Sequence, residues 1–110
     1  MKQFLYRIQP SRVAILTEGA TAEESAAVEA HFNYLERLLG ENVVLLAGRT
    51  LTRDEQTFGI VIFVAPTEEA ALAIMHGDPA VQGGVMKAEL FPYRIALWAP
   101  KGPPPEVGAG

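Results

Sequence analysis

The strongest structural signal in this chain is a short run, Phe58 to Ala65, that is apolar at every position except Gly59. A run of this length, rich in Ile and Val, is typical of a central strand that is covered on both faces. The chain has 110 residues, about the size of one domain, and only two segments with the pattern of a long helix. Two helices cover one face of a small sheet, so the other face needs a partner.

Three further segments carry strand patterns. Residues 3–9 alternate apolar and polar side chains except at Leu5, which predicts a strand with both faces partly buried. Residues 42–51 contain four consecutive large apolar residues and predict a second strand, which a polar hairpin loop at residues 52–56 joins to the apolar run. Residues 86–98 predict the last strand. Pro92 lies inside it and cannot donate to a ladder, so we expect an edge strand or a bulge.

The first helical segment has clear signals at both ends. It begins at Thr21, where Glu24 three residues later completes a capping box, and it ends near Gly40, a natural C-cap. On a helical wheel, Phe32, Leu35 and Leu39 lie within about 40° of Val28, and these four residues predict the buried stripe. His31 lies about 60° from Val28, on the shoulder of that stripe.

The second helix runs from Thr67 to Gly77, with acidic residues in its first turn where the helix dipole favours them. Asp78 and Pro79 follow, and this pair is the N-cap and N1 signature of another short helical turn, closed by Gly83-Gly84. Between the first strand and the first helix, residues 10–19 predict a loop that is long for a compact domain.

The element order is therefore βαββαβ. Its simplest compact form is a ferredoxin-like fold of the α+β class, a four-stranded antiparallel sheet with two helices on one face and the first and third strands at the centre. We expect one domain over residues 1–98 and a flexible Pro/Gly-rich tail over residues 99–110. The uncovered apolar face of the sheet predicts a homodimer, with higher oligomers left open.

Composition excludes several classes of function. No cysteine is present, which rules out disulfides, zinc–thiolate sites and cysteine nucleophiles. The net charge of −4, without a basic cluster, argues against nucleic-acid binding. No membrane-spanning apolar run and no signal-peptide pattern occur, so we expect a cytoplasmic protein. His31, His76 and the scattered acids lack ligand spacing, so we expect no metal, and no motif indicates a cofactor.

Several pieces, taken in order, give the chain its resemblance to a known family. The first helix carries Ala30-His31-Phe32-Asn33-Tyr34-Leu35, and the second strand reads Val44-Leu45-Leu46-Ala47-Gly48. Gly77-Asp78-Pro79 follows the second helix, and Glu89-Leu90-Phe91-Pro92-Tyr93 lies in the last strand. Over about residues 2–98 this order resembles the YCII-related family, a branch of the dimeric α+β barrel superfamily. The resemblance implies a ferredoxin-like fold and a dimeric barrel.

The same resemblance implies a histidine–aspartate active site, and the matching positions are His31 and Asp78. Histidine changes charge near neutral pH, and a carboxylate fixes its tautomer, so the pair suits acid–base chemistry. Each residue also has a structural explanation. His31 suits a core-edge histidine bonded to a backbone carbonyl, and Asp78 suits a helix cap. Both roles of Asp78 are compatible, because a carboxylate has two oxygens.

Arg49 is a further candidate, because it follows Gly48 at the end of the second strand, where many members of the family have proline. An arginine here suits a clamp for the carboxylate of an anionic substrate, or an ordinary exposed ion pair.

Two functions stay open from the sequence. The first is a cofactor-free enzyme of lyase, isomerase or hydrolase type that acts on a small molecule, with His31 as general acid or base and Asp78 orienting it. The second is a non-catalytic dimeric module that binds a small ligand or serves as a subunit. The distance between the two side chains, and a hollow beside them, discriminate between these functions.

Overall fold

The structure is a computed structural model that describes residues 1–105. Its elements in chain order are β1 (Lys2–Pro10), α1 (Ala14–Thr17), α2 (Ala22–Gly40), β2 (Val44–Arg49), β3 (Gly59–Ala65), α3 (Glu68–Gly77), α4 (Pro79–Gln82) and β4 (Met86–Pro92). The last five residues of the expected tail lie outside the described residues. None of the helices within residues 1–105 is long and apolar enough to cross a membrane.

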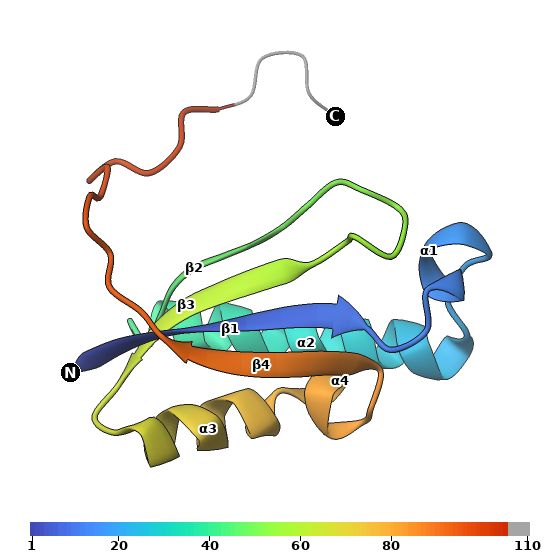
Figure 1. Cartoon of the computed structure of the whole chain (residues 1–110), viewed down its shortest axis with the longest axis horizontal. Coiled ribbons are helices and arrows are strands. Elements are labelled where there is room, and N and C mark those ends of the chain that lie inside the picture. Colours follow the sequence, from blue (N-terminus) through green and yellow to red (C-terminus); the bar gives the residue numbers. More distant parts are fainter. Residues whose placement is uncertain (106–110) are drawn as a thin grey trace.

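The four strands form one antiparallel sheet in the order β2-β3-β1-β4 (Figure 1). The first and third strands are central and the other two are edges, as predicted. In the register, Tyr6 of β1 lies opposite Val61 of β3 and Leu90 of β4. Since directly opposed residues share a face, these three side chains point to the same side of the sheet.

The helices α2, α3 and α4 pack on that side. Contacts join α2 to β2, and α3 and α4 to β4, so the layer of helices spans the sheet from one edge to the other (Figure 1). Between the two layers lies one core, formed mainly by the buried side chains of the central strands and by those of the two longer helices: Phe4, Tyr6, Ile8, Val61, Phe63, Leu35, Leu38 and Met75. The α+β ferredoxin-like prediction is confirmed.

The buried face of α2 differs from the predicted one. Leu35 and Leu38 are its buried residues, whereas Phe32 and Leu39 are exposed. The helix is rotated so that His31, expected on the shoulder, lies near the middle of the inward face. The physical reason is the contact that the His31 ring makes with the buried Asp78, which fixes the rotation of α2 about its axis.

Two segments depart from the prediction, and a third ends as predicted but with a different residue at its cap. The expected strand over residues 86–98 ends at Pro92, and residues 93–98 have no strand partner within residues 1–105. The loop at residues 10–19 contains a single helical turn, α1. The helix expected to end near Gly40 does so, but the left-handed residue is Asn42, with φ 59°, instead of the glycine.

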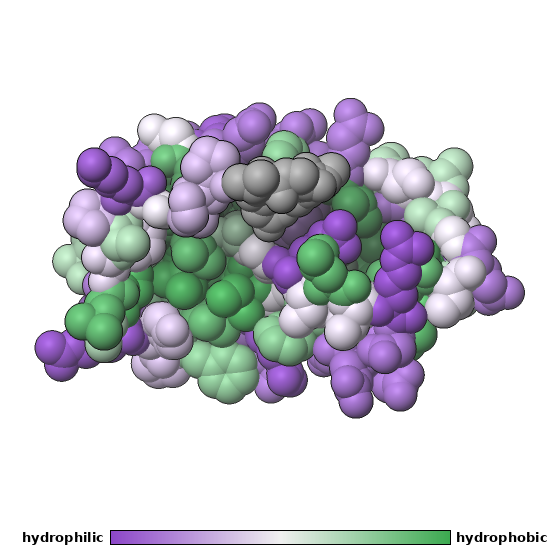
Figure 2. All heavy atoms as spheres, turned by 90° about the horizontal axis from the view of Figure 1, so that it is seen from above, coloured by the Kyte–Doolittle hydropathy of each residue, from purple (hydrophilic) through white to green (hydrophobic). Residues whose placement is uncertain are grey.

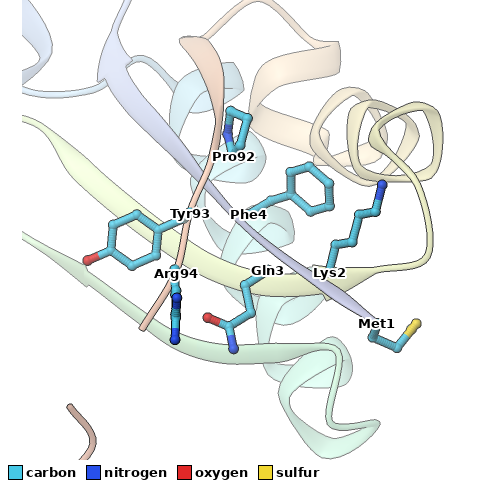
Figure 3. Close-up of a pocket in the computed structure, with 7 residues that line it drawn as sticks. All are labelled: Met1, Lys2, Gln3, Phe4, Pro92, Tyr93 and Arg94. Carbon is cyan, nitrogen blue, oxygen red and sulfur yellow. The ribbon is translucent and has the colours of Figure 1, made fainter. Parts of the chain in front are cut away.

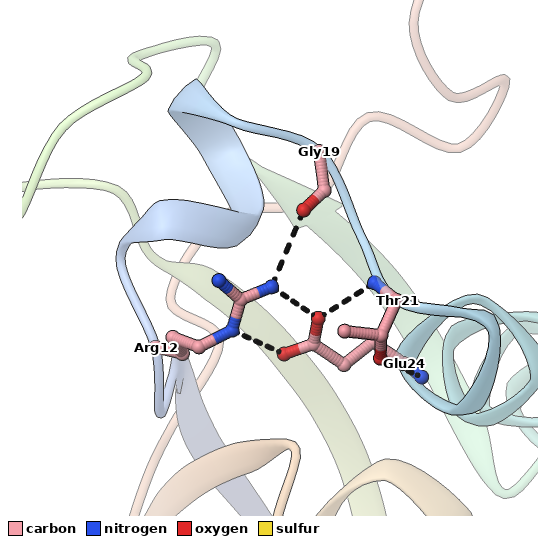
Figure 4. Close-up of polar contacts among 4 residues, drawn as sticks. All are labelled: Arg12, Gly19, Thr21 and Glu24. Atoms are coloured by element: carbon pink, nitrogen blue, oxygen red, sulfur yellow. Dashed lines mark hydrogen bonds and ion pairs between the residues drawn. The ribbon is translucent and has the colours of Figure 1, made fainter.

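The start of α2 is held by a polar cluster (Figure 4). The capping box is present, because Thr21 Oγ1 accepts from the Glu24 N–H at 3.1 Å and Glu24 Oε1 accepts from the Thr21 N–H at 2.8 Å. Arg12 donates to both oxygens of the Glu24 carboxylate, and also to the Gly19 carbonyl at 3.2 Å. Arg12 thereby ties the segment after β1 to the first turn of α2.

Candidate active site

Asp78 is the centre of the site and is fully buried. It lies at the junction of α3 and α4, where Pro79 at the first helical position starts a new turn. Its Oδ1 accepts the N–H of Ala80 at 3.0 Å, so the predicted helix cap is present. A buried carboxylate needs several donors to remain in a protein interior, and the cap supplies one of them.

His31 projects from the inward face of α2 onto this carboxylate. Its Nδ1 lies 2.6 Å from Oδ2 and 2.8 Å from Oδ1 of Asp78, distances of a strong, charge-assisted hydrogen bond. Because a carboxylate only accepts, Nδ1 carries the proton in this bond. The other ring nitrogen, Nε2, has no hydrogen-bond partner among residues 1–105 and is not among the buried unsatisfied atoms, so it reaches the surface.

Tyr6 completes the set, and sequence reasoning missed it. From the middle of β1, its hydroxyl donates to Asp78 Oδ2 at 2.8 Å, and both side chains are fully buried. Burial, the negative charge of Asp78 and this hydrogen bond raise the pKa of Tyr6 well above its ordinary value. The hydroxyl therefore stays protonated and acts as a permanent donor to Asp78.

Tyr34 supports the site from α2, one turn after His31. Its hydroxyl donates to the Ile74 carbonyl at 2.9 Å, which ties α2 to α3. Burial, followed by the nearby charge of Asp78, raises the pKa of Tyr34. A Cβ at Gly77 would lie 3.0 Å from the Tyr34 hydroxyl oxygen, so glycine before Asp78 leaves room for this contact.

The other candidates do not join this cluster. Arg49 lies exposed on the edge strand β2, opposite Gly59, and makes no ion pair or hydrogen bond within the described part of the chain. His76 is exposed at the end of α3. Among residues 1–105, no group of three or more His, Asp or Glu side chains is placed to hold a metal ion.

Two hollows in the surface also lie away from the pair. One, with a volume of about 360 Å³, is lined by the ends of β1 and β4 (Figure 3). The other, of about 100 Å³, lies between the segment after β1 and the β2–β3 loop. Neither is lined by His31 or Asp78, so the cleft expected beside the pair is not one of these two.

Chemically, the cluster is a histidine whose ring orientation is fixed by a hydrogen bond from Nδ1 to a buried carboxylate. Asp78, held by Tyr6 and Ala80, accepts a hydrogen bond from Nδ1–H and so leaves the free lone pair on Nε2, the ring nitrogen that reaches the surface. Such an imidazole accepts a proton at Nε2 as a base and returns it as an acid, with the carboxylate stabilising the imidazolium form.

Comparison with solved structures finds several chains with the same fold, among them one enzyme and one uncharacterised protein. One is 5-chloro-2-hydroxyhydroquinone dehydrochlorinase from Burkholderia phenoliruptrix AC1100 in complex with 2,5-dihydroxybenzoquinone, with a TM-score of 0.63 and 20% sequence identity over 84% of this chain and 93% of that chain. The other is an uncharacterised protein from Thermotoga maritima, with a TM-score of 0.52 and 12% identity over 84% of this chain and 95% of that one. At these identities the likeness shows the fold alone.

A comparison with curated proteins finds no match. The family comparison does, because the YCII-related domain matches residues 8–94, a span that holds β2, β3, β4, all the helices and both members of the His31–Asp78 pair. The match confirms the resemblance drawn from the sequence motifs. This chain belongs to the YCII-related family.

Proposed function

We propose that this protein is a cofactor-free enzyme that moves protons on a small molecule in a lyase, isomerase or hydrolase reaction. The observation that supports this proposal is the pairing of His31 Nδ1 with the buried carboxylate of Asp78, with Nε2 left free for a substrate. His31 is the general base and acid, and Asp78 orients it. A histidine that only stabilises the core has no need to present a ring nitrogen outward.

Elimination is the reaction type that this arrangement fits best. A base at Nε2 removes a proton from a carbon atom, and the resulting imidazolium, paired with Asp78, protonates a leaving group or an enolate oxygen. One structural neighbour is a dehydrochlorinase found with a quinone, which supports a small hydroxylated ring compound as the substrate. We assign Arg49 as the residue that binds a substrate carboxylate, because it is an uncommitted cation within residues 1–105 on the side of the sheet that α2 covers.

We also propose that the working unit is a homodimer of the domain over residues 1–98. The face of the sheet away from the helices carries apolar side chains over one half, namely Leu5, Leu46, Ile60, Ile62, Val64 and Phe91. Leu46 and Phe91 are exposed, Leu5, Ile60 and Val64 are half-buried, and Ile62 is buried already in the single chain. Figure 2 shows hydrophobic residues gathered toward the end of the molecule where the chain begins in Figure 1. A second copy is the simplest cover for this half-face.

The alternative function is a dimeric module that binds a small molecule without turning it over. The position of the two surface hollows favours it, because neither is lined by His31. The two functions differ in one property. In the enzyme His31 controls turnover, whereas in the module it affects ligand binding or nothing.

The test is a substrate panel of chlorinated and hydroxylated hydroquinones and small carboxylated lactones, assayed for chloride release, double-bond migration and hydrolysis. His31→Gln and Asp78→Asn are compared with the wild type, and His76→Gln is the matched control, since His76 is the only other histidine. We expect His31→Gln to lower kcat/KM by about 10²–10⁴-fold, and His76→Gln to leave it within about twofold. Equal turnover by His31→Gln and wild type contradicts the proposal, and binding without turnover supports the module.

A further inference from the structure

We infer that residues 93–98 form an exchanged arm, which each copy of the chain adds as a strand to the free edge of β2 in a second copy. This inference rests on the dimer proposed above and names the segment that joins its two halves.

The arm has the sequence of a strand but no strand partner in its own chain. Five of its six residues are apolar, all but Arg94, and they include Tyr93, Ile95 and Trp98, residue types that are enriched in strands. Within residues 1–105, the backbone N–H groups of residues 94, 96, 97 and 98 have no acceptor. Leu97 is 93% exposed and Trp98 54% exposed. Two large apolar side chains next to unpaired backbone groups indicate a surface that is covered in the working protein.

The root of the arm is fixed, so its direction is defined. The Gln3 carbonyl accepts the N–H of Tyr93 at 3.1 Å, and the Gln3 side chain accepts the N–H of Ile95 at 2.6 Å. Gln3 points to the open face of the sheet, because its neighbours Lys2 and Phe4 point to the helix side (Figure 3). The chain then leaves the end of β4, passes the end of the sheet where β1 begins and continues beyond it on the β2 side (Figure 1).

The edge of β2 is open to receive a strand. Residues 44–48 of β2 contain no proline and no charge, which are the usual protections of an edge strand. By contrast, the other edge, β4, carries Lys87, Glu89 and a terminal proline. Leu46 on β2 is 38% exposed. An extended segment that pairs with this edge satisfies the backbone groups of both strands, as in β-strand addition.

The arm cannot pair along β2 of its own chain. It starts at β4, the opposite edge of the sheet, and three strand spacings of about 4.8 Å separate the two edges. Crossing about 14 Å takes roughly four of its six residues at 3.3 Å each, which leaves too few to run along β2. In a dimer with two-fold symmetry, the β2 edge of the second copy can lie beside the arm, so the arm does not have to cross the sheet. By the same symmetry, each copy gives its arm to the other.

Charge favours another copy of this chain as the partner. Residues 93–105 contain two basic residues, Arg94 and Lys101, and no acidic ones, whereas residues 1–92 contain seven basic and twelve acidic residues. A cationic arm and an acidic body attract each other across a contact between copies.

The first test uses the wild-type chain. Trp98 is its only tryptophan, so the fluorescence emission reports the surroundings of the arm. We expect the emission maximum to move to shorter wavelength as rising concentration converts monomer to dimer, followed in parallel by sedimentation. A dimer whose tryptophan emission stays that of an exposed ring overturns the inference and leaves the dimer standing. A chain that is monomeric at all concentrations overturns both.

The second test is cross-linking between copies, which the absence of native cysteine makes specific. Chains carrying Leu97→Cys are mixed under mild oxidation with chains carrying Leu46→Cys on β2. The control is Leu72→Cys on α3, because Leu72 at 36% exposure matches Leu46 at 38%. We expect the β2 variant to form the mixed disulfide about tenfold faster than the control, or more. Equal rates overturn the inference without bearing on the chemistry at His31.

Discussion

Asp78 belongs both to the fold and to the candidate site. Its carboxylate accepts from Ala80 as a helix cap, from Tyr6 on the central strand and from His31 on α2, and it is wholly removed from water. A buried carboxylate with fewer donors would destabilise the domain by several kcal/mol. The three donors therefore make it possible to keep the charged Asp78 carboxylate in the interior, hydrogen-bonded to the His31 imidazole.

The Tyr6 hydroxyl is predicted to contribute to stability through this carboxylate. Tyr6→Phe removes the donor to Asp78 Oδ2 without changing the packing of the ring, so we expect a loss of about 1–3 kcal/mol in the free energy of unfolding, measured by urea denaturation. Tyr34→Phe, which removes a hydrogen bond to a backbone carbonyl near the surface, is the control and loses about 1 kcal/mol or less. Equal losses would show that the hydrogen bond from Tyr6 to Asp78 contributes no more to stability than the hydrogen bond from Tyr34 to the Ile74 carbonyl.

Of the three side chains in the cluster, the sequence pointed to Asp78 and His31 but not to Tyr6. Asp78 before Pro79 is a visible cap signal, and the family motif pointed to His31. Tyr6 carried no such signal, because its position in an alternating strand is explained by core packing alone. Its partner lies 72 residues away, and only the fold shows that a hydroxyl on β1 meets a carboxylate after α3.

Among the elements, α2 shows what sequence signals can and cannot predict about a helix. Its start was predicted correctly, because the capping box is a local signal that involves only Thr21 and Glu24. Its buried face was predicted correctly at Leu35 but wrongly at Phe32 and Leu39, because apolar residues surround much of the helix and the wheel does not say which of them the sheet covers. The contact of His31 with Asp78 decides the rotation, and that contact is tertiary.

The rotation of α2 leads to a prediction for two adjacent leucines. Leu38 is 7% exposed and Leu39 is 51% exposed. We expect Leu38→Ala to lower the free energy of unfolding by about 2–5 kcal/mol, because it leaves a cavity in the core, and Leu39→Ala to change it by about 0.5 kcal/mol. Denaturation of the two variants side by side measures the difference. The reverse order would restore the stripe predicted from the sequence.

The polar cluster at the start of α2 predicts an acid-dependent stability. Hydrogen bonds from Arg12 and then from the Thr21 N–H lower the pKa of Glu24 from its ordinary 4.5 to about 2. The folded form therefore holds Glu24 ionised more tightly than the unfolded chain does. This contribution is complete above about pH 4.5 and is lost as pH falls through about 2.

Urea denaturation at a series of pH values checks this prediction. Glu24→Gln removes the contribution, so its stability difference from wild type shrinks between about pH 4.5 and pH 2. Glu23→Gln, a change in the same helical turn but outside the cluster, is the control. A constant difference between wild type and Glu24→Gln over this range would mean that the pKa of Glu24 is not lowered.

For the whole molecule, the fold followed from the order of elements and from one apolar strand. A central strand that is apolar on both faces, with helices enough for one face only, was sufficient to predict the layers and the strand order. What the sequence could not place was the end of the last strand. Residues 93–98 have the apolar composition of a strand, but within residues 1–105 of a single chain no strand pairs with them to complete a ladder.

The proposed dimer makes stability depend on protein concentration. Association buries the apolar half-face of the sheet only in the folded form, so mass action raises Tm as the concentration rises. We expect differential scanning calorimetry over a hundredfold concentration range to show a steady increase in Tm. A Tm that does not change over this range would mean that the chain unfolds as a monomer.

The central claim is that Asp78 holds His31 with its proton on Nδ1 and its lone pair on Nε2. Nitrogen-15 NMR of the histidine rings tests it most directly, because protonated and unprotonated ring nitrogens differ widely in chemical shift. For neutral His31 we predict a protonated Nδ1 and an unprotonated Nε2, and in Asp78→Asn a loss of this preference, with His76 unchanged. A proton on Nε2 of His31 in the wild type, or a preference that survives Asp78→Asn, would contradict the account.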